Sequence, residues 1–314
     1  MPRIAFLVKP GPISHLKIAR ALANTLGVDI VRRISGNSHY DIIVALDSTP
    51  KYLLDFVRSK LRCVRVVAYM HDVRSISHSE LTAWDAGRRP LEQRLRRLVS
   101  LSAVKPFVDL FLSPTNAVAQ TVSEYTGVKP CVVHHCVDTG VYHPRDCERK
   151  GLTILTVASK RHIVLNSLAV FSRVSKELNV KLVIRGPCPP HASLVKDVLC
   201  LPHLTESELA RLYSCADLFL YPSLHEGFAL PVLEAMASGL PVVAFAEPSI
   251  MEVVGDAAVL VAPTTIDTMV DAVKAVLTTE ELRARLSRAG IERAREFTCV
   301  KSALELLNCL KLLQ

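Results

Sequence analysis

The chain has 314 residues, of which 50% are hydrophobic, and it carries a formal net charge of +8. This length exceeds that of most single domains, and so much apolar material excludes a disordered chain, so we expect two compact domains. The charge favours anionic partners, but only 5% of the residues are aromatic, which argues against stacking on single-stranded nucleic acid. No apolar run reaches the roughly 18 to 20 residues that span a bilayer, which predicts a soluble or peripheral protein.

Nine cysteines are scattered along the chain without a CxxC pair. An odd number in a chain with so large a core is unlike a secreted disulfide framework, so we expect a cytosolic protein without one. One stretch gathers residue types that bind zinc, although their spacing fits no standard zinc module, so a metal site there is the less favoured alternative. These residues are Cys131, His134, His135, Cys136, His143 and Cys147.

The first half of the chain alternates short apolar runs with longer segments of helical periodicity, which is typical of a parallel α/β sheet. Residues 4–8 form a continuous apolar run that is too short for a secretory leader and predicts the first strand. Gly11 and Pro12 break this run, and apolar residues then recur at helical spacing over 14–26. Further strands are expected at 41–45, 64–69, 110–113 and 130–134.

The second half repeats this alternation. Thr205 and Glu208 form a capping box, which predicts a helix that ends near Ser214. The expected strands cover 151–157, 181–185 and 217–221, and the first helix of this half covers 166–178. A second parallel α/β domain therefore begins near residue 150.

The link at 142–150 contains a proline and five charged residues, which is the composition of a hinge. We therefore expect one Rossmann-like domain over 1–149 and a second over 150–296.

The most informative stretch is 221–244, where a strand ends, a loop turns at Gly227, and a helix follows. Proline suits the first turn of a helix and glycine the position after its end, so Pro231 and Gly239 mark the boundaries of this helix. Two carboxylates result, Glu226 in the loop and Glu234 in the first turn. A carboxylate of this kind can accept hydrogen bonds from two vicinal hydroxyl groups of a sugar.

The start of this helix also suits an anion. The first amides of a helix lack partners within the helix, and the positive end of the dipole lies beside them, which favours a diphosphate. Phe228, Ala229 and Leu230 would supply these amides. The amides and the two carboxylates together predict a nucleotide-sugar site.

Residues 222–244 read Pro-Ser-x-x-Glu-Gly-Phe-x-Leu-Pro-x-x-Glu-Ala-Met-Ala-x-Gly-x-Pro-Val-Val-Ala, a pattern that resembles the GT-B glycosyltransferases of the large family 4 group. The resemblance continues through 212–219 and 252–261, and 133–144 resembles that family's strand and turn into the second domain. It implies the GT-B fold, which consists of two Rossmann-like parallel-sheet domains facing each other across a cleft. The first domain, 1–149, would lie on the acceptor side, and the second, 150–296, would bind most of the nucleotide-sugar donor. Residues 297–314 would form a C-terminal helix that crosses back to the first domain.

The resemblance also implies roles for single residues. Glu226 would contact the donor sugar, with Gly227 beside it, and Glu234 would hold the ribose. Family members use a basic pair near the first strand of the second domain to neutralise the leaving diphosphate, and Lys160 and Arg161 are the candidates. His71 follows the strand at 64–69, at the sheet edge where open α/β sheets bind ligands, and the family often has His-Asp there, facing the donor sugar.

The loop with Gly11 loosely resembles the family's glycine-rich loop, and Lys9, Ser14 and His15 flank it as further candidates for contact with acceptor or donor. The sequence departs from the family at two places. It has Ala-Ser-Lys-Arg-His at 158–162, where the family usually has Gly-Arg followed by Lys-Gly, and it has His-Cys at 135–136, where the family has Asn-Gly.

By resemblance the reaction retains the configuration of the sugar. The nucleoside diphosphate departs, the acceptor hydroxyl attacks from the same face, and the leaving phosphate takes the proton. The protein then stabilises charge and positions the reactants, without a covalent nucleophile. No aspartate-x-aspartate clamp is apparent, so we expect a metal-independent enzyme without a cofactor, whose donor substrate is a nucleoside-diphosphate sugar.

The acceptor is expected to be a glycan, a lipid-linked molecule or a small molecule. Residues 88–97 combine arginines with leucines at helical spacing, which indicates either a helix on an anionic membrane or a solvated basic face on a core helix. We expect a cytoplasmic protein, peripheral at the inner membrane face if that stretch binds lipid, and no nucleic-acid partner. The alternatives are a GT-B epimerase or phosphorylase, and a basic module that binds nucleic acid or anionic lipid on the same scaffold.

Overall fold

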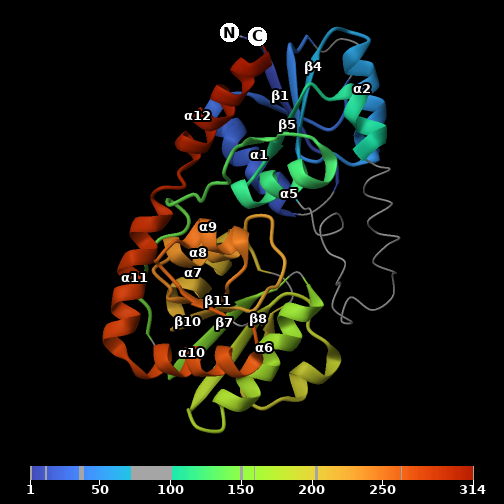
Figure 1. The fold of residues 1–314 in the computed structure, drawn as a ribbon. Helices are drawn as coiled ribbons and strands as arrows, with labels where there is room; N and C mark the ends of the chain where they lie inside the picture. Colours follow the sequence, from blue (N-terminus) through green and yellow to red (C-terminus); the bar gives the residue numbers. More distant parts are fainter. Residues whose placement is uncertain are drawn as a thin grey trace. The chain divides into compact units, whose positions relative to one another are not determined.

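A computed structural model describes residues 2–10, 13–34, 39–71, 101–148, 151–158, 160–201, 204–262 and 264–313. The chain divides into two compact units: Met1–Cys136 with Cys299–Gln314, and Val137–Thr298. Each unit contains a parallel sheet of six strands flanked by helices (Figure 1). The predicted architecture of two Rossmann-like domains is confirmed.

The first unit has the strand order β2-β1-β3-β4-β5-β6. Its strands are β1 (Ile4–Leu7), β2 (Asp29–Val31), β3 (Ile42–Ala45), β4 (Arg65–Tyr69), β5 (Leu110–Ser113) and β6 (Cys131–Val132). Its helices are α1 (Ile13–Leu26), α2 (Leu53–Lys60), α5 (Asn116–Thr126) and α12 (Cys299–Leu310), with short 3-10 turns η1 (Pro50–Tyr52), η2 (Lys105–Phe107) and η4 (Lys311–Leu313). Every residue of β1 and β3 is buried, as expected for parallel strands covered on both faces.

The C-terminal helix α12 belongs to the first unit, where it packs against α1 and β6. Figure 1 shows α12 beside α1. The buried face of α12 carries Ala303, Leu306 and Leu310 at helical spacing, so apolar burial attaches this helix to the first unit.

The second unit has the strand order β12-β11-β10-β7-β8-β9. Its strands are β7 (Leu152–Val157), β8 (Val180–Arg185), β9 (Val198–Leu201), β10 (Leu218–Tyr221), β11 (Val242–Phe245) and β12 (Val259–Val261). Its helices are α6 (Arg161–Val174), α7 (Glu206–Cys215), α8 (Leu230–Ala237), α9 (Pro248–Val254), α10 (Ile266–Thr278) and α11 (Glu280–Ala294), with the 3-10 turn η3 (Pro190–Leu194). The predicted capping box at Thr205 and Glu208 is present with both of its hydrogen bonds.

Two predicted boundaries need correction. The division between the units falls after Cys136 rather than after residue 149, because the linker packs on the second unit. Tyr142 is fully buried there, and its ring lies 6.0 Å from that of Tyr213. Helix α6 begins at Arg161 rather than at residue 166, because Ile163 and Val164 already face the core.

The cysteines correct a further prediction, because eight of the nine form disulfides and only Cys63 is free. The pairs are Cys131–Cys309 and Cys136–Cys299 in the first unit, and Cys147–Cys215 and Cys188–Cys200 in the second. Three of these pairs join residues 68 to 178 positions apart. Only the fold brings them together, so their spacing along the chain gave no sign of them.

The zinc alternative at 131–147 fails for the same reason. Cys131, Cys136 and Cys147 are all bound to other cysteines, so none of them offers the thiolate that binds zinc. Within the described ranges, no group of three or more histidine, cysteine or acidic residues is arranged to hold a metal ion. No helix in those ranges is both long enough and apolar enough for a bilayer span.

Candidate active site

The predicted nucleotide-sugar site lies in the second unit, in the loop between β10 and α8. This loop leaves the carboxyl end of a strand, which is the sheet edge where open α/β folds bind ligands. Ala229 precedes the first helical residue and adopts the left-handed conformation, with φ of 65° and ψ of 54°. Such a conformation is costly for a residue other than glycine and is typical of functional sites. Pro231 lies in the first turn of α8, as predicted.

Glu226 and Lys160, two of the predicted site residues, form an ion pair in this loop. The Oε1 atom of Glu226 accepts hydrogen bonds at 2.6 Å from Lys160 Nζ, 3.0 Å from Tyr221 Oη and 2.5 Å from Ser223 Oγ. Lys160 Nζ also donates to the carbonyl oxygen of His225 at 2.7 Å. The side chains of Lys160 and Glu226 are only 19% and 11% exposed, so each charge depends on the other for compensation.

The position of Lys160 follows from the start of α6. Lys160 is the residue immediately before this helix, and its backbone is extended, so its side chain reaches the β10–α8 loop. The positive end of the α6 dipole therefore lies beside the same loop that precedes α8. Arg161, the other predicted basic residue, is the first residue of α6 and has an exposed side chain.

Glu234 lies on the second turn of α8, one turn later than predicted, because the helix begins at Leu230. Its side chain is buried, and its Oε2 atom accepts a hydrogen bond from Tyr213 Oη at 3.1 Å. Burial raises the pKa of the Tyr213 hydroxyl well above its usual value, and the charge of Glu234 raises it further. Tyr213 therefore stays a hydrogen-bond donor that orients Glu234. Sequence analysis did not assign this role to Tyr213.

The remaining predicted donor-binding residues lie between Glu226 and α8. Phe228 is buried, and its ring lies 5.8 Å from the ring of Phe297. Ala229 and Leu230 are also buried, and Gly227 lies between Glu226 and this apolar segment. The side chains of this segment face the protein, so it is their backbone that is suited to contact a ligand.

Glu247, which follows β11, was missed by sequence analysis. Its Oε2 atom accepts hydrogen bonds from the backbone N–H groups of Ser249 and Ile250 at 3.0 and 3.1 Å, and the backbone of Glu226 also bonds to it. Burial, reinforced by the charge of Glu226, raises the pKa of Glu247 to about 7. Glu247 thus connects the start of α9 to the loop that carries the catalytic candidate.

The first unit contains a second group of predicted residues, around His71 at the carboxyl end of β4. The ring of His71 stacks on those of His15 and Tyr69, with centroids 4.2 and 4.9 Å away. The ring of His135 lies 5.0 Å from it, with an angle of 54° between the planes. Burial lowers the pKa values of His15 and His135, so both rings favour the neutral form. We call these four aromatic rings the histidine stack.

Lys9, two residues after β1, is held by contacts with the segment 51–55. Its Nζ atom lies 2.5 Å from the buried Asp55 and donates to the carbonyl oxygen of Lys51 at 2.6 Å. Its backbone N–H donates to Tyr52 Oη at 3.1 Å. These contacts give Lys9 a structural role, and sequence analysis did not identify its partners. Gly11, residue 72 and the basic stretch 88–97 lie outside the described residues.

Comparison with known proteins links this geometry to a family. Residues 159–293 match the family of glycosyl transferases group 1. An O-antigen chain mannosyltransferase from Escherichia coli is 35% identical over 36% of this chain and 30% of its own length. An MMP alpha-(1->4)-mannosyltransferase from Mycolicibacterium hassiacum is 29% identical over 74% of this chain and 61% of its own length. The chain thus covers less than two thirds of the length of these relatives.

A solved structure extends the likeness over both units. The crystal structure of Anabaena HepE in complex with UDP and glucose has a TM-score of 0.73, with 16% identity over 99% of this chain and 100% of the other. At this identity the likeness shows the fold. The family match thus lies in the unit that carries Glu226 and Glu234, and the solved structure shows that both units have the GT-B fold.

Proposed function

We propose that this protein is a retaining glycosyltransferase, which transfers a sugar from a nucleoside-diphosphate sugar to an acceptor hydroxyl. The observation that carries the proposal is the partly buried pair of Lys160 and Glu226 in the loop before α8, with Glu234 oriented on that helix. One cation and two carboxylates lie in one unit, in the loop after β10 and on the helix that follows it. This arrangement matches a ligand that carries both phosphates and hydroxyl groups.

The second unit can stabilise a leaving diphosphate by charge. Lys160 supplies a full positive charge, and the N-termini of α6 and α8 add the positive ends of two helix dipoles. Glu226 would bind the sugar and Glu234 the ribose, each through its carboxylate oxygens. Fixed charges of this kind favour a transition state in which negative charge develops on the leaving group.

In the proposed reaction, the bond between the anomeric carbon and the diphosphate oxygen breaks, and its electron pair leaves with the nucleoside diphosphate. The acceptor hydroxyl attacks the same face, and its proton passes to the leaving phosphate, so the configuration is retained. Lys160 neutralises the charge that accumulates, and His71 contacts the donor sugar. These groups supply the positive charge that stabilises the leaving diphosphate, so we propose that the reaction proceeds without a metal ion.

The relatives suggest which donors to test first. Two of them are named as mannosyltransferases, and the HepE structure holds UDP and glucose. We therefore propose a hexosyl donor on UDP or GDP, and an acceptor hydroxyl on a glycan, a lipid-linked molecule or a small molecule. Membrane contact through residues 88–97 remains part of the proposal.

The disulfides bear on where the protein works. Four disulfides are unusual in a reducing cytosol, except in hyperthermophiles, whose intracellular proteins are rich in them. The sequence predicted a cytosolic protein without disulfides. We propose instead that the protein works where these cysteines stay oxidised, either inside a hyperthermophile or outside the cytosol. Titration of free thiols in protein isolated without reductant tests this, with one thiol expected and nine contradicting it.

The function is tested by thermal shift and calorimetry with UDP, GDP, ADP and their sugar conjugates, in the presence of chelator. Binding of one nucleotide by the wild type, and its loss in Glu234→Ala, is the expected result. Glu281→Ala, which removes an exposed carboxylate on α11, serves as the control. The absence of any nucleotide response in wild type and variant alike would refute the transferase. NMR of the product anomer then separates retention from inversion.

A further inference from the structure

We propose that His135 is a positioning residue that fixes the ring of His71, and that the two disulfides of the first unit hold His135 in place. The inference rests on the transferase function proposed above, in which His71 contacts the donor sugar. All the residues involved belong to the first unit.

The geometry of the histidine stack points to this role. The ring of His71 stacks with that of His15 at 4.2 Å and with that of Tyr69 at 4.9 Å, and both ring planes lie within 25° of its own. His135 meets the same ring at 5.0 Å with an angle of 54° between the planes. His71 is thus enclosed by three aromatic rings that arrive from α1, β4 and the segment after β6. A ring enclosed from several directions has few rotamers available.

His135 acts by packing rather than by proton transfer. Its side chain is 5% exposed. Burial lowers its pKa to about 3, with further contributions from His15 and His134, so the ring is neutral at physiological pH. A neutral ring packs against another imidazole without charge repulsion, and a group with so low a pKa is a poor general acid or base near pH 7.

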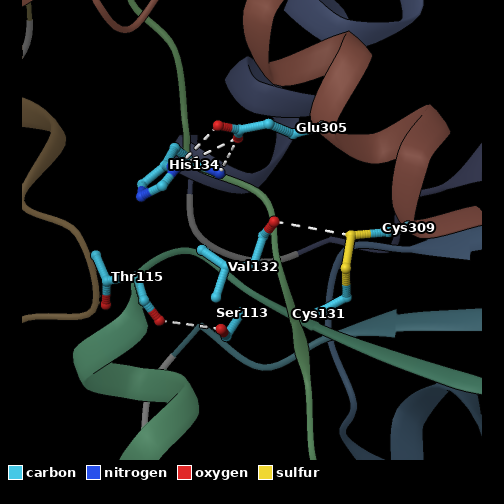
Figure 2. Close-up of a disulfide and its surroundings, with 7 residues drawn as sticks. All are labelled: Ser113, Thr115, Cys131, Val132, His134, Glu305 and Cys309. Carbon is cyan, nitrogen blue, oxygen red and sulfur yellow. Dashed lines mark hydrogen bonds and ion pairs between the residues drawn. A yellow bond between two sulfur atoms is a disulfide. The ribbon is translucent and has the colours of Figure 1, made fainter.

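The segment that carries His135 is clamped on both sides of it. Cys131–Cys309 and Cys136–Cys299 join it to α12. Between these disulfides, Glu305 of α12 accepts the backbone N–H of His134 at 2.8 Å and lies 3.1 Å from its Nδ1 atom (Figure 2). His135 therefore lies between a carboxylate-bound residue and a disulfide-bonded one, and its backbone has little freedom to move.

The clamp also accounts for a departure noted in the sequence. The resembled family has Asn-Gly at 135–136, and this chain has His-Cys. In the structure the histidine contacts His71 and the adjacent cysteine forms the disulfide with Cys299. The histidine at 135 and the cysteine at 136 are therefore connected, because the disulfide of Cys136 restrains the backbone beside His135.

The kinetic test compares His135→Ala and His135→Phe with the wild type, in both a His71 and a His71→Ala background. We expect His135→Ala to lower kcat by about tenfold to a hundredfold, because a small misplacement of a positioned group has an effect of this size. His135→Phe keeps a ring in place, so it should retain more activity than the alanine variant. In the His71→Ala background, His135→Ala should cause no further loss.

The role of the disulfide is tested with the double variant Cys136→Ser/Cys299→Ser. It should lower kcat in the same direction as His135→Ala and leave the nucleotide affinity of the second unit unchanged. Cys63→Ser, at the free exposed thiol, and His143→Ala, at an exposed histidine in the second unit, are the controls. An unchanged kcat in His135→Ala, or an equal loss with and without His71, would overturn the positioning role.

One readout does not depend on activity. Histidine side-chain NMR should show the ring resonances of His71 shifting in His135→Ala and in the Cys136→Ser/Cys299→Ser variant, but not in His143→Ala. If the wild type transfers no sugar but these shifts occur, the proposed function fails while the positioning contact stands. If the His71 resonances do not move, the contact itself is refuted, even in an active enzyme.

Discussion

The candidate sites in the two units are built by different means. In the second unit, Lys160 and Glu226 form a pair of opposite charges, with Glu234 on the helix that follows. In the first unit, the histidine stack consists of aromatic rings, of which those of His15 and His135 favour the neutral state. Disulfides to α12 hold the segment that carries His135. The difference teaches that the two carboxylates of a charged site can be encoded in one motif, whereas its cation and a packed site depend on contacts that only the fold creates.

The largest expected effect comes from breaking the charged pair with Lys160→Met. The variant leaves the Glu226 carboxylate partly buried with only hydroxyl donors, so the free energy of unfolding should fall by about 2 kcal/mol. Loss of a group that stabilises transition-state charge should lower kcat by about a hundredfold to a thousandfold. Denaturant unfolding and steady-state kinetics measure the two effects.

The chain offers a matched control for this variant. Lys274 and Glu177 are also 2.6 Å apart in the second unit, but their side chains are 26% and 62% exposed. Lys274→Met should change the unfolding free energy by less than about 0.5 kcal/mol and leave kcat unaltered. Equal effects of the two substitutions would show that burial does not set the strength of the Lys160 pair.

The next prediction concerns how the unfolding free energy depends on pH through Glu247, whose pKa is raised to about 7. A carboxyl group with a raised pKa in the folded state adds stability below its unfolded pKa, near 4.5, and loses it as the pH rises through 7. Glu247→Gln stays neutral at all pH values. Relative to the wild type, it should therefore gain up to about 3 kcal/mol in unfolding free energy between pH 5 and pH 8.

Urea unfolding of both proteins at pH 5 and pH 8 measures this gain. A difference between variant and wild type that stays the same at both pH values would mean that Glu247 remains ionised in the fold. His135 contributes with the opposite sign, because its ring is neutral in the fold and gains a proton on unfolding below its usual pKa of 6.5. Both proteins contain His135, so its contribution cancels in the difference between them.

The third effect tests the covalent part of the first unit. Its disulfides are nested, because the Cys136–Cys299 pair lies within the loop closed by Cys131–Cys309, and their partners are 163 and 178 positions apart. When one disulfide is removed, the other still closes nearly the whole loop. Removing both with serine should therefore destabilise the protein by about 2 kcal/mol more than the sum of the two single removals.

Denaturant unfolding of the two single-disulfide variants and of the combined variant measures this excess. In the second unit the Cys188–Cys200 pair also lies within the loop closed by Cys147–Cys215, but the partners are only 12 and 68 positions apart, so the inner disulfide leaves most of the outer loop open when the outer one is removed. Additive losses in the first unit would argue that the two disulfides do not act together on the unfolded chain.

The comparison also explains what sequence analysis achieved. The alternation of strands and helices and the loop with Glu226 were predicted because each depends on local spacing along the chain. The capping box at Thr205 and Glu208 is local in the same sense. The partner of Lys160 is Glu226, which is 66 positions away, and no local pattern indicates such a contact.

The missed features depend on residues brought together by the fold. Cys131 and Cys309 are 178 positions apart, and His71 and His135 belong to different strand ends. Glu247 reads as an ordinary helix cap, and only its burial against the Glu226 loop changes its acidity. The domain boundary was misplaced because the charged linker looked like solvent-exposed chain, whereas Tyr142 within it is fully buried.

The smallest expected effect concerns Ala229, whose φ of 65° lies in the left-handed region. Glycine adopts this conformation without a clash of Cβ, so Ala229→Gly should relieve strain in the folded state. It should also widen the conformational freedom of the unfolded chain, which offsets part of the gain. We expect a net stabilisation of no more than about 1 kcal/mol, together with unchanged binding of nucleotide, since the backbone there keeps its course. A loss of stability in thermal unfolding would show that the buried methyl group contributes more by packing than the backbone conformation costs.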